Sequence, residues 1–248
     1  MDLKGKVAIV TGGGTGMGKA ISTLLAANGA SVAVNYSRSE ADAVATAEEL
    51  TKAGVEALPI QADVSSAADV AAMVEQTERQ LGRVDLLVNN AGYTAFVPMR
   101  DIDGLSEDEW DRIMDVNVKG IWLCTKAAAP AMRRAGGGAV VNVASIAGLK
   151  VTGSSMAYAV SKAAAIHLTK CLALALSPEI RVNAVAPGLV VTRWWGHASE
   201  EQLNTMRNNM PLKRSVSPEE IATTTLELLK NDSITGQTIA LDAGALLP

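Results

Sequence analysis

Short apolar runs alternate with longer segments of helical period along the chain, and this alternation restricts the possible folds more than any other feature. The runs are rich in Val, Ala, Leu and Ile, which is typical of strands buried on both faces of a sheet. Repeated strand–helix units predict a parallel sheet with right-handed crossovers and helices on both faces. We expect strands at residues 6–11, 31–36, 55–61, 84–89, 139–144, 180–186 and 237–241. We expect helices at 17–28, 40–53, 67–81, 106–134 and 155–177, and another that begins at Ser217.

Residues 188–213 break this rhythm. They contain Trp194, Trp195 and His197 among many polar residues, which favours a lid over a binding site. No linker, internal repeat or low-complexity tract divides the chain, so we expect the 248 residues to form a single α/β domain. Its sheet would be doubly wound and parallel, with about seven strands.

Composition excludes several classes of function. The formal net charge of −4 offers no basic patch for nucleic acid or anionic lipid. The start of the chain lacks a signal peptide's apolar core, and no apolar run approaches the ~20 residues of a membrane span, so we expect a cytoplasmic protein. Cys124 and Cys171 have no paired motif and are interpreted as small buried residues in a reducing compartment. The acidic run 101–111 is interpreted as a helix start and a solvated loop rather than a metal site.

A glycine-rich loop lies between the first expected strand and the first expected helix. Its sequence is Thr11-Gly12-Gly13-Gly14-Thr15-Gly16-Met17-Gly18. Glycines at such a turn let the backbone approach a pyrophosphate, and the N–H groups of the helix N-terminus then face the anion. The spacing is Gly-x-x-x-Gly-x-Gly rather than the standard dinucleotide-binding pattern. In this position the loop predicts nucleotide binding on a Rossmann-like sheet.

The end of the second strand indicates which dinucleotide fits. An acidic residue there would bind the two hydroxyls of an adenosine ribose. This chain instead reads Tyr36-Ser37-Arg38, and its first acid is Glu40. A nearby cation without a carboxylate favours a 2′-phosphate, so we expect NADP(H) in preference to NAD(H), although NAD(H) remains possible.

Tyr158 and Lys162 form a candidate acid/base pair. Four residues apart, they share one face of a helix with Cβ atoms roughly 5–6 Å apart. A free phenol has a pKa of about 10, and an adjacent ammonium favours the phenolate and lowers that pKa. The pair therefore suits the interconversion of a carbonyl and an alcohol.

The chain resembles the short-chain dehydrogenase/reductases from Lys6 to Asp242. Seven motifs occur in the order of that family: the glycine spacing, Asp63-Val64, Asn89-Asn90-Ala91-Gly92, Asn117, Ser145, Tyr158-x-x-x-Lys162 and Pro187-Gly188. The resemblance implies that Tyr158 exchanges a proton with the substrate oxygen and that Ser145 hydrogen-bonds the same oxygen. It also implies that Lys162 lowers the pKa of the tyrosine and holds the nicotinamide ribose, and that Asn117 positions Lys162.

The resemblance also assigns the cofactor contacts. Asp63 and Val64 would contact adenine, Asn90 would lie near the adenosine ribose, and Thr192 would hold the carboxamide. The full set of expected cofactor residues is Gly12, Gly14, Thr15, Gly16, Met17, Gly18, Tyr36, Ser37, Arg38, Asp63, Val64, Asn90, Ala91, Gly92, Lys162, Pro187, Gly188 and Thr192. Many relatives are tetramers, and we expect a homotetramer here.

Aromatic residues are scarce, so two adjacent tryptophans in the lid point to an apolar or aryl substrate. The expected pocket wall is Tyr93, Phe96, Val151, Met156, Leu189, Trp194, Trp195 and Met206. His197 is assigned to the surface and His167 to an ordinary helix position.

Three functions remain open. The first is an NADP-dependent carbonyl reductase, and the second is a 3-oxoacyl-[acyl-carrier-protein] reductase. The second needs a basic rim for an acidic carrier, which Arg193, Arg207, Lys213 and Arg214 could supply. The third is a nucleotide-binding regulator without turnover, which would not need the complete Asn, Ser, Tyr and Lys set.

Overall fold

A seven-stranded parallel sheet organises the molecule, in the order β3-β2-β1-β4-β5-β6-β7. The computed structural model describes residues 1–196 and 198–248, so His197 lies outside the described residues. The strands are β1 (Val7–Val10), β2 (Ser31–Tyr36), β3 (Ala57–Gln61), β4 (Leu86–Asn89), β5 (Gly138–Val143), β6 (Ile180–Pro187) and β7 (Thr238–Leu241). The α/β class and the doubly wound parallel sheet are therefore confirmed.

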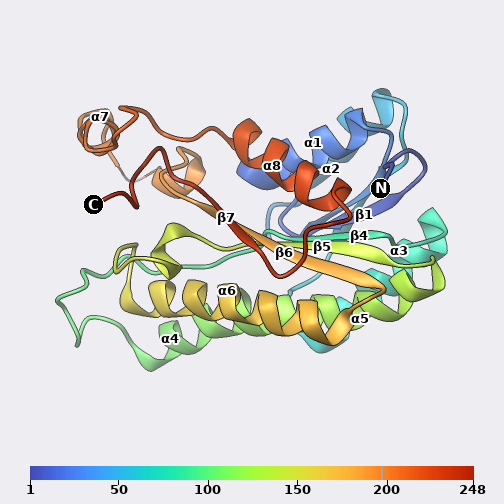
Figure 1. Ribbon diagram of the computed structural model, residues 1–248, viewed down its shortest axis with the longest axis horizontal. Coiled ribbons are helices and arrows are strands. Elements are labelled where there is room, and N and C mark those ends of the chain that lie inside the picture. The colour runs from blue at the N-terminus through green and yellow to red at the C-terminus, as the bar shows by residue number, and fades with distance from the viewer. Residues whose placement is uncertain (197) are drawn as a thin grey trace.

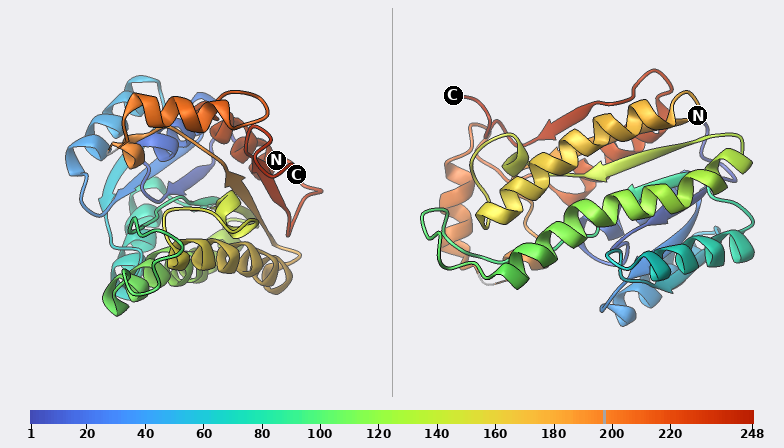
Figure 2. Two further views of the ribbon diagram at one scale, coloured as in Figure 1. Left: turned by 90° about the vertical axis from the view of Figure 1, so that its left-hand side faces the viewer. Right: turned by 90° about the horizontal axis from the view of Figure 1, so that it is seen from below.

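Helices cover both faces of the sheet, as Figures 1 and 2 show. One face carries α1 (Gly16–Ala27), α2 (Glu40–Lys52) and α8 (Pro218–Lys230). The other carries α3 (Ala67–Leu81), α4 (Glu107–Met114), α5 (Gly120–Arg134) and α6 (Met156–Leu176). The short helix α7 (Glu200–Asn208) stands at one end of the molecule, near the C-terminus.

The predicted helix starts are confirmed where Ser precedes an acid or amide by three residues. Ser106 accepts a hydrogen bond from the backbone of Glu109, and Ser217 forms a reciprocal capping box with Glu220. The single helix expected over 106–134 is wrong in one respect. A π-helical turn, η1 (Asp115–Lys119), separates α4 from α5.

The core lies on both sides of the sheet because the central strands bury every side chain, as their continuous apolar sequences predict. Ile21 and Leu229 belong to the cluster under α1 and α8, and Met73 and Met132 to the cluster under α3 and α5. Cys124 is buried as expected, but the prediction for Cys171 is wrong, since this residue is exposed on α6.

Helix α6 has the length and the apolar composition of a membrane span, which the sequence analysis did not expect. A window on this helix reaches a mean hydropathy of 1.4 because Ala, Val, Ile and Leu outweigh its scattered polar residues. The helix packs on β5 and β6 and buries Lys162, so it behaves as a core helix of the sheet.

The strand order also locates the site. The chain passes from β1 outward to β2 and β3, then returns to β4 on the other side of β1. Loops that leave neighbouring strands in opposite directions open a crevice at the carboxyl ends of those strands. The glycine-rich loop follows β1, and Asn90 follows β4, so both lie at this crevice.

Candidate active site

The glycine-rich loop is packed so closely that side chains would not fit at its key positions. A Cβ atom on Gly18 would lie 2.1 Å from the carbonyl oxygen of Gly12, and one on Gly14 would lie 2.7 Å from the Cα atom of Ala43. Gly12 and Gly16 have φ angles of +62° and +51°, which disfavour side chains. The loop therefore holds its backbone, rather than side chains, against the crevice.

Two side-chain amides, the buried one of Asn35 and the partly buried one of Asn90, brace this loop. The Asn35 side chain accepts a hydrogen bond from the backbone N–H of Gly12 (3.3 Å) and donates to the carbonyl of Ala62 (3.1 Å). The Asn90 side chain donates to the carbonyls of Thr11 (2.9 Å) and Gly12 (3.2 Å). Both amides thus fix the loop to the ends of the neighbouring strands. This role of Asn35 was not predicted, although a polar residue within an apolar strand was a usable signal.

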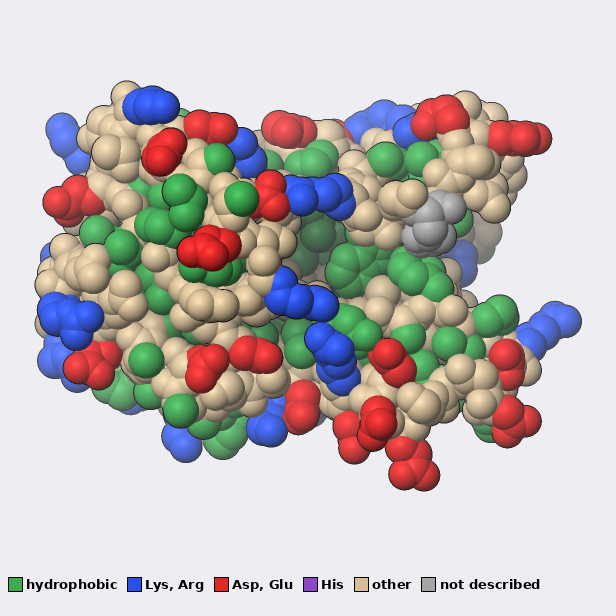
Figure 3. Space-filling model, turned by 180° about the vertical axis from the view of Figure 1, so that it is seen from behind, with side chains coloured by type: hydrophobic (Ala, Val, Ile, Leu, Met, Phe, Trp, Pro, Cys, Tyr) green, Lys and Arg blue, Asp and Glu red, His purple; other side chains and the backbone are tan. Residues whose placement is uncertain are grey.

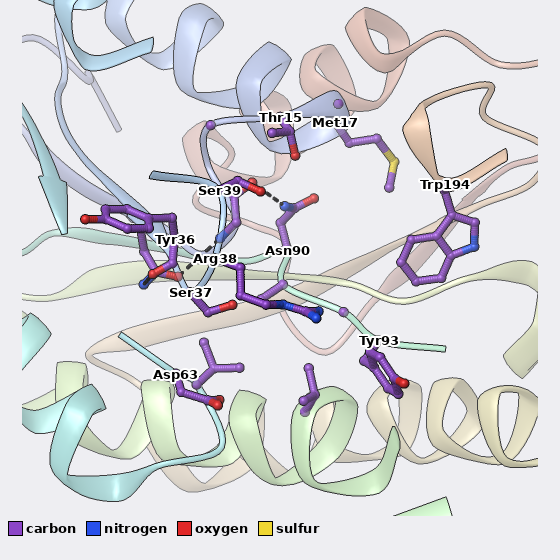
Figure 4. Close-up of a pocket in the computed structure, with 18 of the residues that line it drawn as sticks. Thr15, Met17, Tyr36, Ser37, Arg38, Ser39, Asp63, Asn90, Tyr93 and Trp194 are labelled. Atoms are coloured by element: carbon purple, nitrogen blue, oxygen red, sulfur yellow. Dashed lines mark hydrogen bonds between the residues drawn. The ribbon is translucent and has the colours of Figure 1, made fainter. Parts of the chain in front are cut away.

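The loop borders a cavity of about 540 Å³. Figure 4 shows this cavity with Thr15 and Met17 on one side, Tyr36 to Ser39 beside it, and Tyr93 and Trp194 at the other end. The predicted cofactor residues that line it are Gly12, Gly14, Thr15, Gly16, Met17, Tyr36, Ser37, Arg38, Asp63, Val64, Asn90, Ala91, Gly92 and Thr192. Lining residues that were not named from the sequence include Ser39, Arg112 and Val116, and Arg193 was named only for a basic rim.

The structure fits an anionic cofactor because two helix N-termini at this cavity are uncapped. Thr15 precedes α1 and Ser39 precedes α2, and neither side chain accepts a hydrogen bond from its helix. Serines cap α3, α4, α6, α7 and α8. A bound phosphate would satisfy the free N–H groups and the positive dipole ends. Because Arg38 and Ser37 lie beside the second terminus, the cavity offers two separate places for phosphate.

Tyr158 and Lys162 are brought together as predicted. Helix α6 begins after Ser155, whose side chain accepts a hydrogen bond from the backbone N–H of Tyr158 (3.2 Å). The Nζ atom of Lys162 lies 5.5 Å from the centre of the Tyr158 ring and donates to the carbonyl of Val143 (2.9 Å). Strand β5 therefore anchors the ammonium beside the phenol.

Burial dominates the titration of both groups. Burial raises the pKa of Tyr158 to about 12, and the hydrogen bond with Ser145 lowers it by less. Burial lowers the pKa of Lys162 to about 8 because the ammonium loses water. The expected lowering of the tyrosine pKa below its ordinary value is therefore not found in this structure.

Ser145 and Asn117 complete the predicted set. The Ser145 hydroxyl donates weakly to the carbonyl of Pro187 (3.4 Å) and lies at the carboxyl end of β5, before the short 3-10 helix η2 (Ile146–Gly148). Asn117 lies in the π-helical turn and is buried. Its side chain accepts from the backbone N–H of Tyr93 (2.8 Å) and donates to its carbonyl (2.9 Å) and to the hydroxyl of Ser161 (3.0 Å). Asn117 therefore reaches α6 through Ser161, the residue before the lysine.

A second cavity of about 560 Å³ adjoins the first, and Met17, Asn90, Gly92, Thr192 and Trp194 line both. Ser145, Tyr158, Lys162, Pro187 and Gly188 line this second cavity. Its apolar wall includes Phe96, Ile146, Leu189, Trp195, Met206 and Met210. The ring of Trp194 lies 6.0 Å from that of Tyr158, and the rings of Phe96 and Trp195 meet edge to face at 6.1 Å.

The structure does not bring every expected wall residue to this cavity. Tyr93 lines the first cavity instead. Val151 is 88% exposed and Met156 is 41% exposed, and neither lines either cavity. Val151 lies in the loop before α6, and Met156 begins that helix on a side turned away from the cavity. Apolar residues close to Tyr158 in the sequence therefore need not line the cavity. Whether they do depends on which way their side chains face at the start of the helix.

The lid lies against the cofactor half of the molecule. It contains the 3-10 helix η3 (Arg193–Trp195), and the Arg193 guanidinium pairs with the carboxylate of Asp42 on α2 at 2.8 Å. Figure 3 shows the hollow on this face, with hydrophobic side chains in its depth and Lys and Arg side chains along its mouth. The described residues contain no group of His, Cys, Asp and Glu side chains arranged for a metal ion.

Comparisons with known proteins agree with this geometry. Residues 12–245 match the profile of a family described as enoyl-(acyl carrier protein) reductase. The chain is 41% identical over 243 residues to a protein of Streptomyces violaceoruber named as ketoacyl reductase 2 of the granaticin polyketide synthase, covering 97% of this chain and 96% of that protein.

Two further similarities extend over almost the whole chain. The 3-oxoacyl-[acyl-carrier-protein] reductase FabG of Staphylococcus aureus is 39% identical over 244 residues, which are 96% of this chain and 97% of FabG. The crystal structure of a short-chain type dehydrogenase/reductase from Mycobacterium marinum superposes with a TM-score of 0.91 at 36% identity, covering 100% of this chain and 98% of that one.

Proposed function

Because this chain belongs to the short-chain dehydrogenase/reductase family, we propose that it is an NADP(H)-dependent ketoreductase that acts on apolar or aryl ketones and the corresponding secondary alcohols. The observation that carries the proposal is the apolar cavity beside Tyr158 and Ser145, which opens directly into the cofactor cavity. A ketone bound in this cavity would place its oxygen near the hydroxyl groups of Tyr158 and Ser145. Its carbonyl carbon would face the cofactor cavity.

Each residue of the site has its own role in the interconversion of ketone and alcohol. When bound, the nicotinamide cofactor supplies or accepts the hydride. Tyr158 donates a proton to the carbonyl oxygen during reduction and takes it back during oxidation, while Ser145 hydrogen-bonds the same oxygen. Lys162 stabilises the negative charge that forms on Tyr158 when the proton leaves. Asn117 links α6 to the backbone of Tyr93 through hydrogen bonds and so holds both in position beside this site.

Two features support the preference for NADP(H). The uncapped N-terminus of α2 lies at the cavity, and the Arg38 side chain extends from beside it into the cavity, so a 2′-phosphate between them would find N–H donors and a positive charge. No aspartate or glutamate follows β2 until Glu40. Glu40 itself is hydrogen-bonded to Tyr36. Burial first, and then the charge and hydrogen bond of Glu40, raise the pKa of that tyrosine.

The aromatic lining supports the choice of substrate. The ring of Trp194 lies 6.0 Å from that of Tyr158, and the edge-to-face pair of Phe96 and Trp195 also lines the cavity. Aromatic rings prefer offset or edge-to-face contacts, and such a pair adds about 0.5–1.5 kcal/mol beyond the area that it buries. An aryl ketone can make such contacts, whereas a short aliphatic ketone cannot.

A second candidate is a 3-oxoacyl thioester carried by an acyl carrier protein, which the names of the two relatives favour. A carrier needs free cations at the entrance, and the four expected ones are largely occupied. Arg193 pairs with Asp42, Arg207 with Glu200 and Arg214 with Glu220. Lys213 donates to the carbonyl of Asn208. These contacts favour a free ketone over a carrier-bound substrate.

A panel of substrates tests the proposal. NADPH oxidation would be followed with acetophenones of graded size and with aliphatic ketones. It would also be followed with one 3-oxoacyl group, supplied either as its N-acetylcysteamine thioester or as its thioester with an acyl carrier protein. We expect the highest kcat/KM for an aryl ketone and no gain from the carrier. A carrier-dependent increase of tenfold or more would favour the second candidate, and the absence of any turnover would favour a regulator. The homotetramer and the cytoplasmic location stay predictions.

A further inference from the structure

Among residues 1–196 and 198–248, three arginines line the cofactor cavity, and two of them have no acidic partner. Arg193 is paired with Asp42. Among the described residues, neither Arg38 nor Arg112 has a hydrogen bond or an ion pair with a carboxylate. Two cations that face one cavity repel each other unless an anion lies between them. Of the two arginines without an acidic partner, only Arg38 has a role predicted from the sequence.

Arg112 is held in a defined place on α4. Its guanidinium lies over the ring of Tyr93, 4.3 Å from the ring centre. The Tyr93 hydroxyl donates to the carboxylate of Glu109 at 2.9 Å, and Asn117 holds the backbone of Tyr93. The tyrosine thus forms a fixed platform for the arginine, and Glu109 is engaged with the phenol rather than with the guanidinium.

Arg38 approaches from the opposite wall. It follows β2, and Figure 4 shows its side chain extended across the cavity toward Tyr93. The hydrogen bond with Glu109 and burial raise the pKa of Tyr93, while the charges of both Arg112 and Arg38 lower it. Both guanidiniums therefore lie near the same phenol, although β2 and α4 are on different sides of the crevice.

We propose that Arg112 is a second binding arm for the 2′-phosphate of the cofactor, so that Arg38 and Arg112 close on this group from opposite walls. The inference rests on the proposed NADP(H) preference and deepens it. Guanidinium groups suit this task because their planar set of N–H donors matches phosphate oxygens. A phosphate of charge near −2 also removes the repulsion between the two cations.

The test uses two ligands that differ only in the 2′-phosphate. Titration calorimetry would measure the affinity of the full-length protein for 2′,5′-ADP and for 5′-AMP. Arg112→Gln is expected to weaken 2′,5′-ADP binding on the order of tenfold to a hundredfold, the range for a hydrogen bond between charged groups. Binding of 5′-AMP should change by less than about twofold. Arg100→Gln removes an exposed arginine that lines neither cavity and should leave both affinities unchanged.

Arg38→Gln separates failure of this inference from failure of the proposed function. If Arg38→Gln weakens only 2′,5′-ADP and Arg112→Gln does not, the second arm is refuted and the NADP(H) preference stands. If neither variant distinguishes the two ligands, the 2′-phosphate assignment itself fails. An equal loss for both ligands in Arg112→Gln would also overturn the inference, since it would place Arg112 against the common part.

A second variant covers the case in which Arg112→Gln folds poorly. Tyr93→Leu removes the ring beneath the guanidinium and leaves the charge in place. We expect a smaller but selective loss of 2′,5′-ADP affinity, about threefold to tenfold, because a cation–π contact of this kind contributes modestly. A Tyr93→Leu protein that binds 2′,5′-ADP as tightly as the wild type would refute the role of the platform.

Discussion

Replacement of Lys162 by methionine tests whether the lysine works through its charge. The Nζ atom lies 5.5 Å from the centre of the Tyr158 ring, and the side chain is buried. When Tyr158 gives up its proton during ketone reduction, negative charge forms on the phenol. With this distance and an effective dielectric constant of about 20, the Coulomb attraction is about 3 kcal/mol. We therefore expect Lys162→Met to lower kcat about a hundredfold at pH 6.5.

The pH dependence gives this prediction its specific signature. Burial lowers the pKa of Lys162 to about 8, so the ammonium is present below this pH and is lost as the pH rises through it. The kcat of the wild type should fall as the pH rises through about 8. Lys162→Met has no group to titrate there, so its profile should be flat, and the two curves should approach each other toward pH 10.

The assay is kcat for aryl ketone reduction between pH 6 and 10, with both cofactor and ketone saturating. Lys150→Met is the matched control, because Lys150 is an exposed lysine whose Nζ also donates to a backbone carbonyl, that of Ala245 at 3.1 Å. A ratio of wild type to Lys162→Met that stays constant across the pH range would refute the electrostatic reasoning. It would show that the lysine acts only through its contacts.

Three further changes test other parts of the structure. Tyr158→Phe should lower kcat about a hundredfold to ten-thousandfold and leave the Kd for NADPH within about twofold, as measured by stopped-flow kinetics and calorimetry; a variant with full kcat would refute the role as acid. Asp85→Ala removes a fully buried carboxylate that accepts hydrogen bonds from Lys6 and Arg83. Urea unfolding should show that the free energy of unfolding falls by about 3–5 kcal/mol, and a fall below about 1 kcal/mol would contradict this. Gly18→Ala would place a methyl group 2.1 Å from the Gly12 carbonyl oxygen, so the free energy of unfolding should fall by about 1–3 kcal/mol. An unchanged unfolding midpoint would mean that the loop shifts to accept the methyl group without a cost in stability.

Local features of the sequence were enough to predict most of the fold. The strands were found because residues buried on both faces leave continuous apolar runs such as Leu86–Asn89. The starts of α4 and α8 followed from Ser106 and Ser217, since capping depends on residues within one turn. The proximity of Tyr158 and Lys162 followed in the same way from four-residue helical spacing.

Properties that depend on distant parts of the chain were not predicted. The pKa of Tyr158 is raised because the surrounding elements bury it, and no local pattern reports that burial. Arg193 was a candidate for a basic rim that would bind an acidic carrier, but it pairs with Asp42, which lies 151 residues away. The direction of the α6 start, which turns Met156 away from the cavity, also depends on packing between elements.

The π-helical turn explains why the sequence did not indicate Arg112 as a residue of the cofactor cavity. Arg112 and Asn117 are five residues apart, and on a regular α-helix they would be separated by about 140° around the axis. In the structure both contact Tyr93, Arg112 over the ring and Asn117 at the backbone. The turn at 115–119 bonds Gly120 to Asp115, five residues back, and thereby brings the two side chains toward one face. The π-helical turn therefore places Asn117, which contacts α6, on the same side as Arg112 at the cofactor cavity. A regular α-helical period would place these two residues on different sides of the helix.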